Sequence, residues 1–240
     1  LDNYVELVVD ERLRGSFVNA LVLVGFYSVL PVAIAVVIAG ISSRMRIRGQ
    51  RTYRALLFAP QVVAMVVIGV IWQWLYAPRG PINALLDTVG LGALARPWLG
   101  DFTFALPALG LVGTWFMLGL AVVLLVAAVQ RVPQELYEAA SLDGAGPLRQ
   151  FRVVTIPHIR GEIAVALVLA MLQALRNFDL VYVTTMGGPG RQTAVPAFEV
   201  FNQAFRVGRV GAGAAIGVAL ALLIFALTFL ITRIAERGEP

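Results

Sequence analysis

The sequence predicts an all-α, polytopic membrane protein folded as one helical bundle, and three observations lead to this fold class. Apolar residues make up 59% of the 240 residues, whereas charged residues make up only 14%. The mean hydropathy of +0.83 is too high for a soluble domain of this length. The charges also gather in short segments between long uncharged runs. We therefore expect residues 1–240 to form a single transmembrane domain.

Five uncharged or nearly uncharged runs are long enough to cross about 30 Å of hydrocarbon as helices. The expected spans are Val18–Ser42, Tyr53–Ala77, Phe104–Val129, Glu162–Val183 and Val210–Ile231. Only the fourth is interrupted by charges well inside the run, at Arg176 and Asp179.

The placement of arginines predicts how these spans are oriented. The short connection Ser43–Arg54 contains five arginines, and such clusters mark the cytoplasmic side of a membrane. Alternation from this connection places Glu138–Pro157 and the C-terminus, after Arg233, in the cytoplasm as well. Five spans then leave the N-terminus outside, so we expect one further N-terminal span, upstream of Leu1, to be missing from this sequence.

Several kinds of chemistry lack their central residue in this sequence. All nineteen basic residues are arginine, so neither a P-loop lysine nor a Schiff-base lysine is present. There is no cysteine and only one histidine, His158, which excludes thiolate chemistry and a His/Cys zinc cluster. We therefore expect no cofactor and no catalytic site in this chain. The net charge of +5 is better explained by topology than by nucleic-acid binding.

The connection 131–160 is long for a loop between two spans, and its sequence predicts two short helices. Pro133 suits an early position in the first helix, and Gly144 is a suitable residue to end it. Pro147 then begins a second helix, which we expect to end at Ile156-Pro157. The apolar stripe of this second helix consists of Leu148, Phe151 and Val154.

The same connection resembles the EAA loop of binding-protein-dependent ABC importer permeases. The residues at the family's spacing are Glu138-Ala139-Ala140, Asp143-Gly144-Ala145, Phe151 and Pro157. The resemblance extends over nearly the whole chain, through Asn3-Tyr4, Leu57-Phe58-Ala59-Pro60, Trp72-Gln73-Trp74, Asn177-Phe178-Asp179 and Gly187-Gly188-Pro189. This set is most similar to the first-type permeases of carbohydrate uptake systems, which are related to the maltose and glycerol-phosphate importers.

The resemblance implies the fold of a type I ABC importer permease and a set of partners. These are a second permease subunit, two ATP-binding subunits that hold ATP and Mg, and an extracytoplasmic solute-binding protein, assembled in the lipid of a bacterial cytoplasmic (inner) membrane. In the family, the glutamate matching Glu138 anchors the loop in the ATPase, and the glycine matching Gly144 makes its turn. The transport mechanism implied is alternating access driven through this loop.

The neighbours of these two residues have simpler expected roles. Ala139 and Ala140 are small, which allows another surface to approach the helix closely. For Asp143 two roles remain open, because it either forms the turn or caps the second helix.

Two groups of residues are candidates for the solute pathway. Gln173 and Asn177 are four residues apart, so they share one face of a continuous helix, and their amides suit the hydroxyl groups of a sugar. Amides also hold transmembrane helices together, which is the alternative role. In maltose-type permeases the positions matching Gln173 and Asn177 line the solute cavity. On the third span the resemblance places the cavity face at Gly113, Phe116, Met117 and Leu120, which is more apolar than a maltose site.

Ionisable side chains within a membrane span cost free energy, so their presence indicates a functional or structural role. Arg176 and Asp179 are three residues apart, a spacing that permits a mutual ion pair. The alternative function is an ion- or proton-coupled secondary transporter that uses Asp179, which would need midplane acids, broken helices and internal repeats. The sequence has one acid near the end of a span and no repeat. A membrane enzyme is disfavoured because the sequence has no nucleophile elbow and no paired intramembrane carboxylates.

Overall fold

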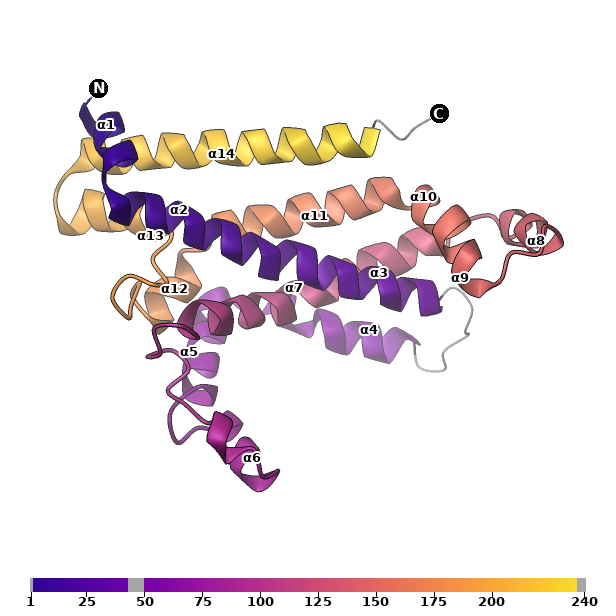
Figure 1. Cartoon of the computed structure of the whole chain (residues 1–240), viewed down its shortest axis with the longest axis horizontal. Helices are drawn as coiled ribbons and strands as arrows, with labels where there is room; N and C mark the ends of the chain where they lie inside the picture. The colour runs from indigo at the N-terminus through magenta and orange to yellow at the C-terminus, as the bar shows by residue number, and fades with distance from the viewer. Residues whose placement is uncertain (1, 43–49, 237–240) are drawn as a thin grey trace.

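The computed structural model describes residues 2–42 and 50–236, and they form an elongated bundle of helices with no β-strand among them (Figure 1). The elements along the long axis are α2 (Glu11–Val24), a π-helical turn (Gly25–Val29), α3 (Leu30–Ser42), α7 (Ala105–Val129), α11 (Arg160–Leu175) and α14 (Val210–Glu236). This architecture confirms the all-α fold class. Most of the arginine-rich connection Ser43–Arg54 lies outside the described residues.

Four of the five expected spans correspond to helical stretches that are long and apolar enough to cross a membrane. These stretches are Glu11–Ile41, Ala105–Val129, Arg160–Thr184 and Val210–Glu236. The first stretch begins seven residues before the expected Val18, because Asp10 accepts a hydrogen bond from the Arg12 N–H (2.8 Å) and caps α2.

The second expected span is not one straight helix. Helix α4 (Gln50–Phe58) passes into a 3₁₀ turn (Ala59–Val62), and α5 (Met65–Leu75) then leaves at an angle of 107°. The expected span over Tyr53–Ala77 is therefore bent, and it makes a fifth span when its two arms are counted together. Pro60 explains the break, because proline cannot donate a backbone hydrogen bond and Val63 adopts an extended conformation. Beyond α5, the short helix α6 (Pro81–Thr88) projects away from the bundle (Figure 1).

The fourth expected span falls within Arg160–Thr184 and contains a short non-helical step. Helix α11 ends at Leu175, and α12 (Asp179–Thr184) begins only after a non-helical step. Among the salt bridges of the described residues, none joins Arg176 to Asp179, so the ion pair that their spacing permits is not formed. Both side chains are exposed instead.

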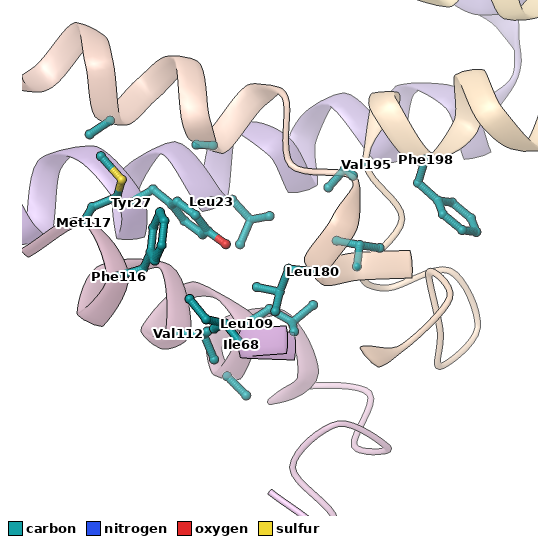
Figure 2. Packing of buried hydrophobic residues seen from close by; sticks show 14 of the residues in the cluster. Leu23, Tyr27, Ile68, Leu109, Val112, Phe116, Met117, Leu180, Val195 and Phe198 are labelled. Carbon is teal, nitrogen blue, oxygen red and sulfur yellow. The ribbon is translucent and has the colours of Figure 1, made fainter. Parts of the chain in front are cut away.

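Helix α7 is the centre of the bundle. Within the most apolar 18-residue segment of α7, 67% is buried inside the chain. The corresponding share for α14 is 17%, so α14 presents most of its surface to the surroundings. Figure 2 shows the main core cluster, in which Tyr27, Leu109, Phe116, Ile68 and Leu180 pack together from four different elements. This cluster lies between the α7 face and the two broken spans.

Two glycines of α7 allow neighbouring segments to approach its axis. A Cβ atom at Gly113 would overlap the ring of Tyr27, and one at Gly119 would overlap the backbone carbonyl of Leu57 in α4. The first clash involves a buried ring and the second involves backbone, so neither neighbour has room to move aside.

The end of the bundle opposite α8 (Gln134–Leu142) is held together by polar contacts. Arg209, next to α14, binds Glu6 of α1 (Asp2–Val9) through both guanidinium nitrogens, and this hydrogen bonding lowers the pKa of Glu6. Helix α13 (Pro196–Phe201) continues as a π-helical turn (Asn202–Arg206). It contains Glu199, which is fully buried and forms a salt bridge with Arg191.

We predict that Gly119→Ala lowers the stability of the protein by about 1–3 kcal/mol, the usual cost of overpacking. Thermal unfolding of the purified chain in detergent, followed by tryptophan fluorescence, measures the change. Gly15→Ala is the matched control, because a Cβ at Gly15 meets nothing within 4 Å and alanine favours the helix. Equal stability of the two variants would show that the α4–α7 contact is looser than described.

Candidate functional site

The connection from α7 to α11 forms two short helices joined by a tight corner. Helix α8 (Gln134–Leu142) ends where Gly144 adopts a left-handed conformation, with φ of +74°. The Gly144 N–H donates to the Ser141 carbonyl (3.0 Å), and the Ala145 N–H donates to the Ala140 carbonyl (2.9 Å). These two bonds are the pair that defines a Schellman motif, which satisfies the last carbonyls of a helix. The expected helix stop at Gly144 is confirmed.

The corner is stabilised from inside by a glutamine that no sequence motif identifies. Gln150, at the end of α9 (Pro147–Gln150), donates to the Ser141 hydroxyl (2.7 Å) and to the Ala145 carbonyl (2.9 Å). The Tyr137 and Thr155 hydroxyls form a second cross-link between the two helical segments, at 2.9 Å. Each helix is therefore bonded to the other through side chains as well as through the turn.

The second helical segment runs on into α11. A π-helical turn (Phe151–Thr155) follows α9, then α10 (Ile156–His158), and α11 begins after a kink at Ile159. The segment ends at His158, one residue after the predicted end at Ile156-Pro157. The Ile156 N–H bonds five residues back to the Phe151 carbonyl, and this wider turn makes room for the proline that follows.

The outer surface of the corner is exposed. Glu138, Ala139, Asp143 and Gly144 are all exposed, Ala140 is half-buried, and the intervening Leu142 is 90% exposed. Asp143 occupies the C-cap position directly after α8, and no side chain caps α9. The capping role is therefore wrong for Asp143, whereas its place in the turn is confirmed. A charged and apolar edge thus points away from the bundle, at the end farthest from α1 (Figure 1).

The inner surface of the same connection is anchored to two other helices. Phe151 packs so closely on α3 that a Cβ atom at Gly40 would overlap its ring. Arg131, just after α7, forms a salt bridge with Glu162 in the first turn of α11. The connection between α7 and α11 therefore contacts both α3 and α11 through side chains.

Two of the candidate solute residues contact Tyr27, in the π-helical turn of the first span. The Asn177 side-chain amide donates to the Tyr27 hydroxyl (3.0 Å), and the Tyr27 ring lies against Gly113. Asn177 lies beyond the end of α11, so it does not share a helical face with Gln173 as expected. Tyr27 and Asn177 are buried, whereas Gln173 is half-buried. A tyrosine within an apolar span is the signal that could have identified Tyr27.

The other α7 candidates lie beside the break in the second span. Phe116 and Met117 are buried, and Leu120 is partly buried. Gln61, directly after Pro60, donates to the Phe116 carbonyl (2.6 Å). Irregular backbone at membrane depth is tolerated where it is buried in protein or lines a polar cavity. A polar residue beside a proline within a span is the signal that could have identified Gln61.

Comparison with known proteins identifies the family. The model of the family described as "Binding-protein-dependent transport system inner membrane component" matches residues 16–238. The chain belongs to this family. It is 36% identical to the diacetylchitobiose uptake system permease protein NgcF of Streptomyces coelicolor, over 99% of this chain and 71% of that protein.

Two further comparisons agree with this assignment. The permease is 32% identical to the trehalose/maltose transport system permease protein MalF of Thermococcus litoralis, over 80% of this chain and 64% of that one. A crystal structure of a bacterial alginate ABC transporter, in complex with a periplasmic protein bound to alginate pentasaccharide, contains a chain of the same fold. That chain matches with a TM-score of 0.84 and 20% identity, over 99% of this permease and 83% of its own length.

We predict that Gly144→Val loosens the corner between α8 and α9. A β-branched residue at a left-handed position costs about 1–2 kcal/mol, so amide hydrogen exchange over residues 134–150 should quicken about tenfold. Gly144→Asn is the control, since asparagine tolerates this conformation and a Cβ at Gly144 meets nothing within 4 Å. Exchange that is unchanged in the valine variant would contradict this role of Gly144.

We predict that Tyr27→Phe destabilises the permease by about 1–3 kcal/mol, because the buried Asn177 amide loses its acceptor. Thermal unfolding in detergent measures the change. Tyr4→Phe is the control, since Tyr4 is 46% exposed, and its effect should stay within about 0.5 kcal/mol. A Tyr27→Phe variant as stable as the control would show that the bond contributes nothing.

Proposed function

We propose that this permease is one of two membrane-spanning subunits of an ATP-driven importer for a sugar or sugar derivative. The single observation that carries this proposal is the exposed corner formed by α8 and α9. The two helices are hydrogen-bonded to each other, and the corner is joined to α3 and α11. Relatives that carry diacetylchitobiose, trehalose or maltose in their names support the choice of a sugar.

The corner is the proposed contact with the ATP-binding subunits. Glu138, Ala139, Ala140, Asp143 and Gly144 form or border its exposed edge. A short helix that is bonded to its neighbour transmits a displacement, whereas a loose loop absorbs it. ATP and Mg are held by the partner subunits, and closure of those subunits pushes the corner and opens the pathway outward. The corner and the C-terminus lie in the cytoplasm in this proposal.

The outer end of the permease faces a solute-binding protein in this proposal. The alginate transporter of the same fold was crystallised with such a periplasmic protein. A secondary transporter that uses Asp179 receives no support, because Asp179 is exposed and a coupling acid needs a buried site near the bilayer midplane.

We predict that Glu138→Lys abolishes ATP-dependent uptake while the protein still inserts. Reversal of a charge at an interface costs several kcal/mol, so uptake and ATPase stimulation by the binding protein should fall at least about tenfold. Uptake into vesicles containing the assembled transporter measures this.

Glu135→Lys is the matched control, since Glu135 is exposed on the same helix one turn earlier. Uptake retained by Glu138→Lys, or uptake driven by a proton gradient without nucleotide, would sink the proposal.

We further propose that the solute passes the residues around Tyr27 and the break at Pro60. Gln173 and Leu120 are half-buried at the edge of this region, where Gly113, Phe116, Met117 and Asn177 form the packed interior. Movement of α11 against α7 during transport would open this region to the solute. Amide groups beside aromatic rings suit the hydroxyl groups and apolar faces of a sugar.

Gln173→Ala is expected to raise the solute concentration needed for half-maximal uptake about fivefold, the effect of losing one hydrogen bond. Uptake by the reconstituted transporter with radiolabelled sugar measures this. Gln192→Ala, at an exposed position in the loop after α12, is the control. An unchanged half-maximal concentration would place the solute elsewhere.

A further inference from the structure

Two apolar grooves flank the contact between α11 and α14, near the C-terminal end of α14. Ala164 and Ala235 line both grooves, which have volumes of about 270 and 290 Å³. The larger groove is lined by Arg160, Ile163, Ala164, Leu167, Ile231, Ile234 and Ala235. The grooves exist because small residues face each other between the two helices and leave space on either side.

The two grooves differ in charge. The larger one contains a single charged residue, Arg160, and the smaller one contains a single charged residue, Glu236. They are otherwise alike in their aliphatic walls. An anionic group is therefore attracted to the mouth of the larger groove and repelled from the mouth of the smaller one.

Arg160 is available for an external anion. Its side chain takes part in no hydrogen bond and no salt bridge within the part of the chain that the structure describes. Glu162, the nearest acid on the same helix, is already paired with Arg131. Arg160 is also the first residue of α11, which has no side-chain cap, so the positive end of that helix adds to the charge of the guanidinium.

We propose that the larger groove binds an anionic phospholipid of the cytoplasmic leaflet. The phosphate lies at Arg160, and one acyl chain lies along Ile163, Leu167 and Ile231. From Arg160 to Leu167 the helix rises about 10 Å, which is roughly a third of the hydrocarbon thickness. Basic pockets between transmembrane helices on the cytoplasmic side are known to hold anionic head groups. The leaflet rests on the orientation proposed above.

The test is native mass spectrometry of the purified chain in detergent, titrated with phosphatidylglycerol and with phosphatidylcholine of the same acyl chains. The chain should retain phosphatidylglycerol preferentially, and Arg160→Gln should weaken that retention about fivefold, the contribution of one arginine near an anionic surface. Arg233→Gln is the matched control, because Arg233 is exposed at the same end of the bundle and lines neither groove.

Two results would overturn the proposal. One is retention that is equal for the two lipids or unchanged in Arg160→Gln. The other is retention by the isolated chain that disappears from the assembled transporter, which would show that a protein helix fills the groove instead. Because lipid retention needs neither ATP nor solute, a failure here leaves the proposed transport function untouched, and a failure of uptake leaves this result standing.

Discussion

Close approach to the axis of α7 is the constraint on which the rest of the bundle depends. Because Gly113 and Gly119 lack side chains, the Tyr27 ring lies on one part of the helix and the α4 backbone lies on another. Those contacts place the first and second spans against α7 on different sides. Association of helices in a membrane gains little from the hydrophobic effect, so close van der Waals packing of this kind has to supply much of the energy.

The same constraint joins the two candidate sites. Tyr27 connects α7 to the break after α11 through Asn177, while Phe151 connects the α8–α9 corner to α3, which continues from the Tyr27 turn. Helix α11 spans the distance between them, from the salt bridge at Glu162 to its end at Leu175. The polar core and the exposed corner are thus connected through α3 and α11.

Most of the fold was predictable because hydrophobic length is a strong signal in membrane proteins. Each of the two interrupted spans contains a residue that is unusual within a membrane helix. This residue is Pro60 in the second span and Arg176 in the fourth. Neither residue alone predicts whether the helix kinks or ends. The outcome depends on contacts with distant segments, such as the hydrogen bond from Gln61 to α7. The corner was predictable from local signals, because a glycine at a helix end acts within a few residues.

The less predictable residues act over long sequence separations. Tyr27 and Asn177 meet across 150 positions, and Gln150 is a common residue whose role appears only when two helices face each other. The motif that contains Glu138 predicted an exposed edge. No motif predicted that Phe116 and Met117 are buried. A pattern indicates the face of a helix, but it does not show which neighbour covers that face.

The kink at Ile159 gives α11 the properties of a lever. Ile159 is only 1% exposed, so the pivot is enclosed by core residues and is not free to slide. The sixteen residues of α11 extend about 24 Å beyond this point. A rotation of about 10° at the pivot displaces the far end by about 4 Å, close to the rise of one helical turn. The arm ends beside Asn177, so under the proposed mechanism a small angular change at the corner becomes a displacement of atomic size beside Tyr27.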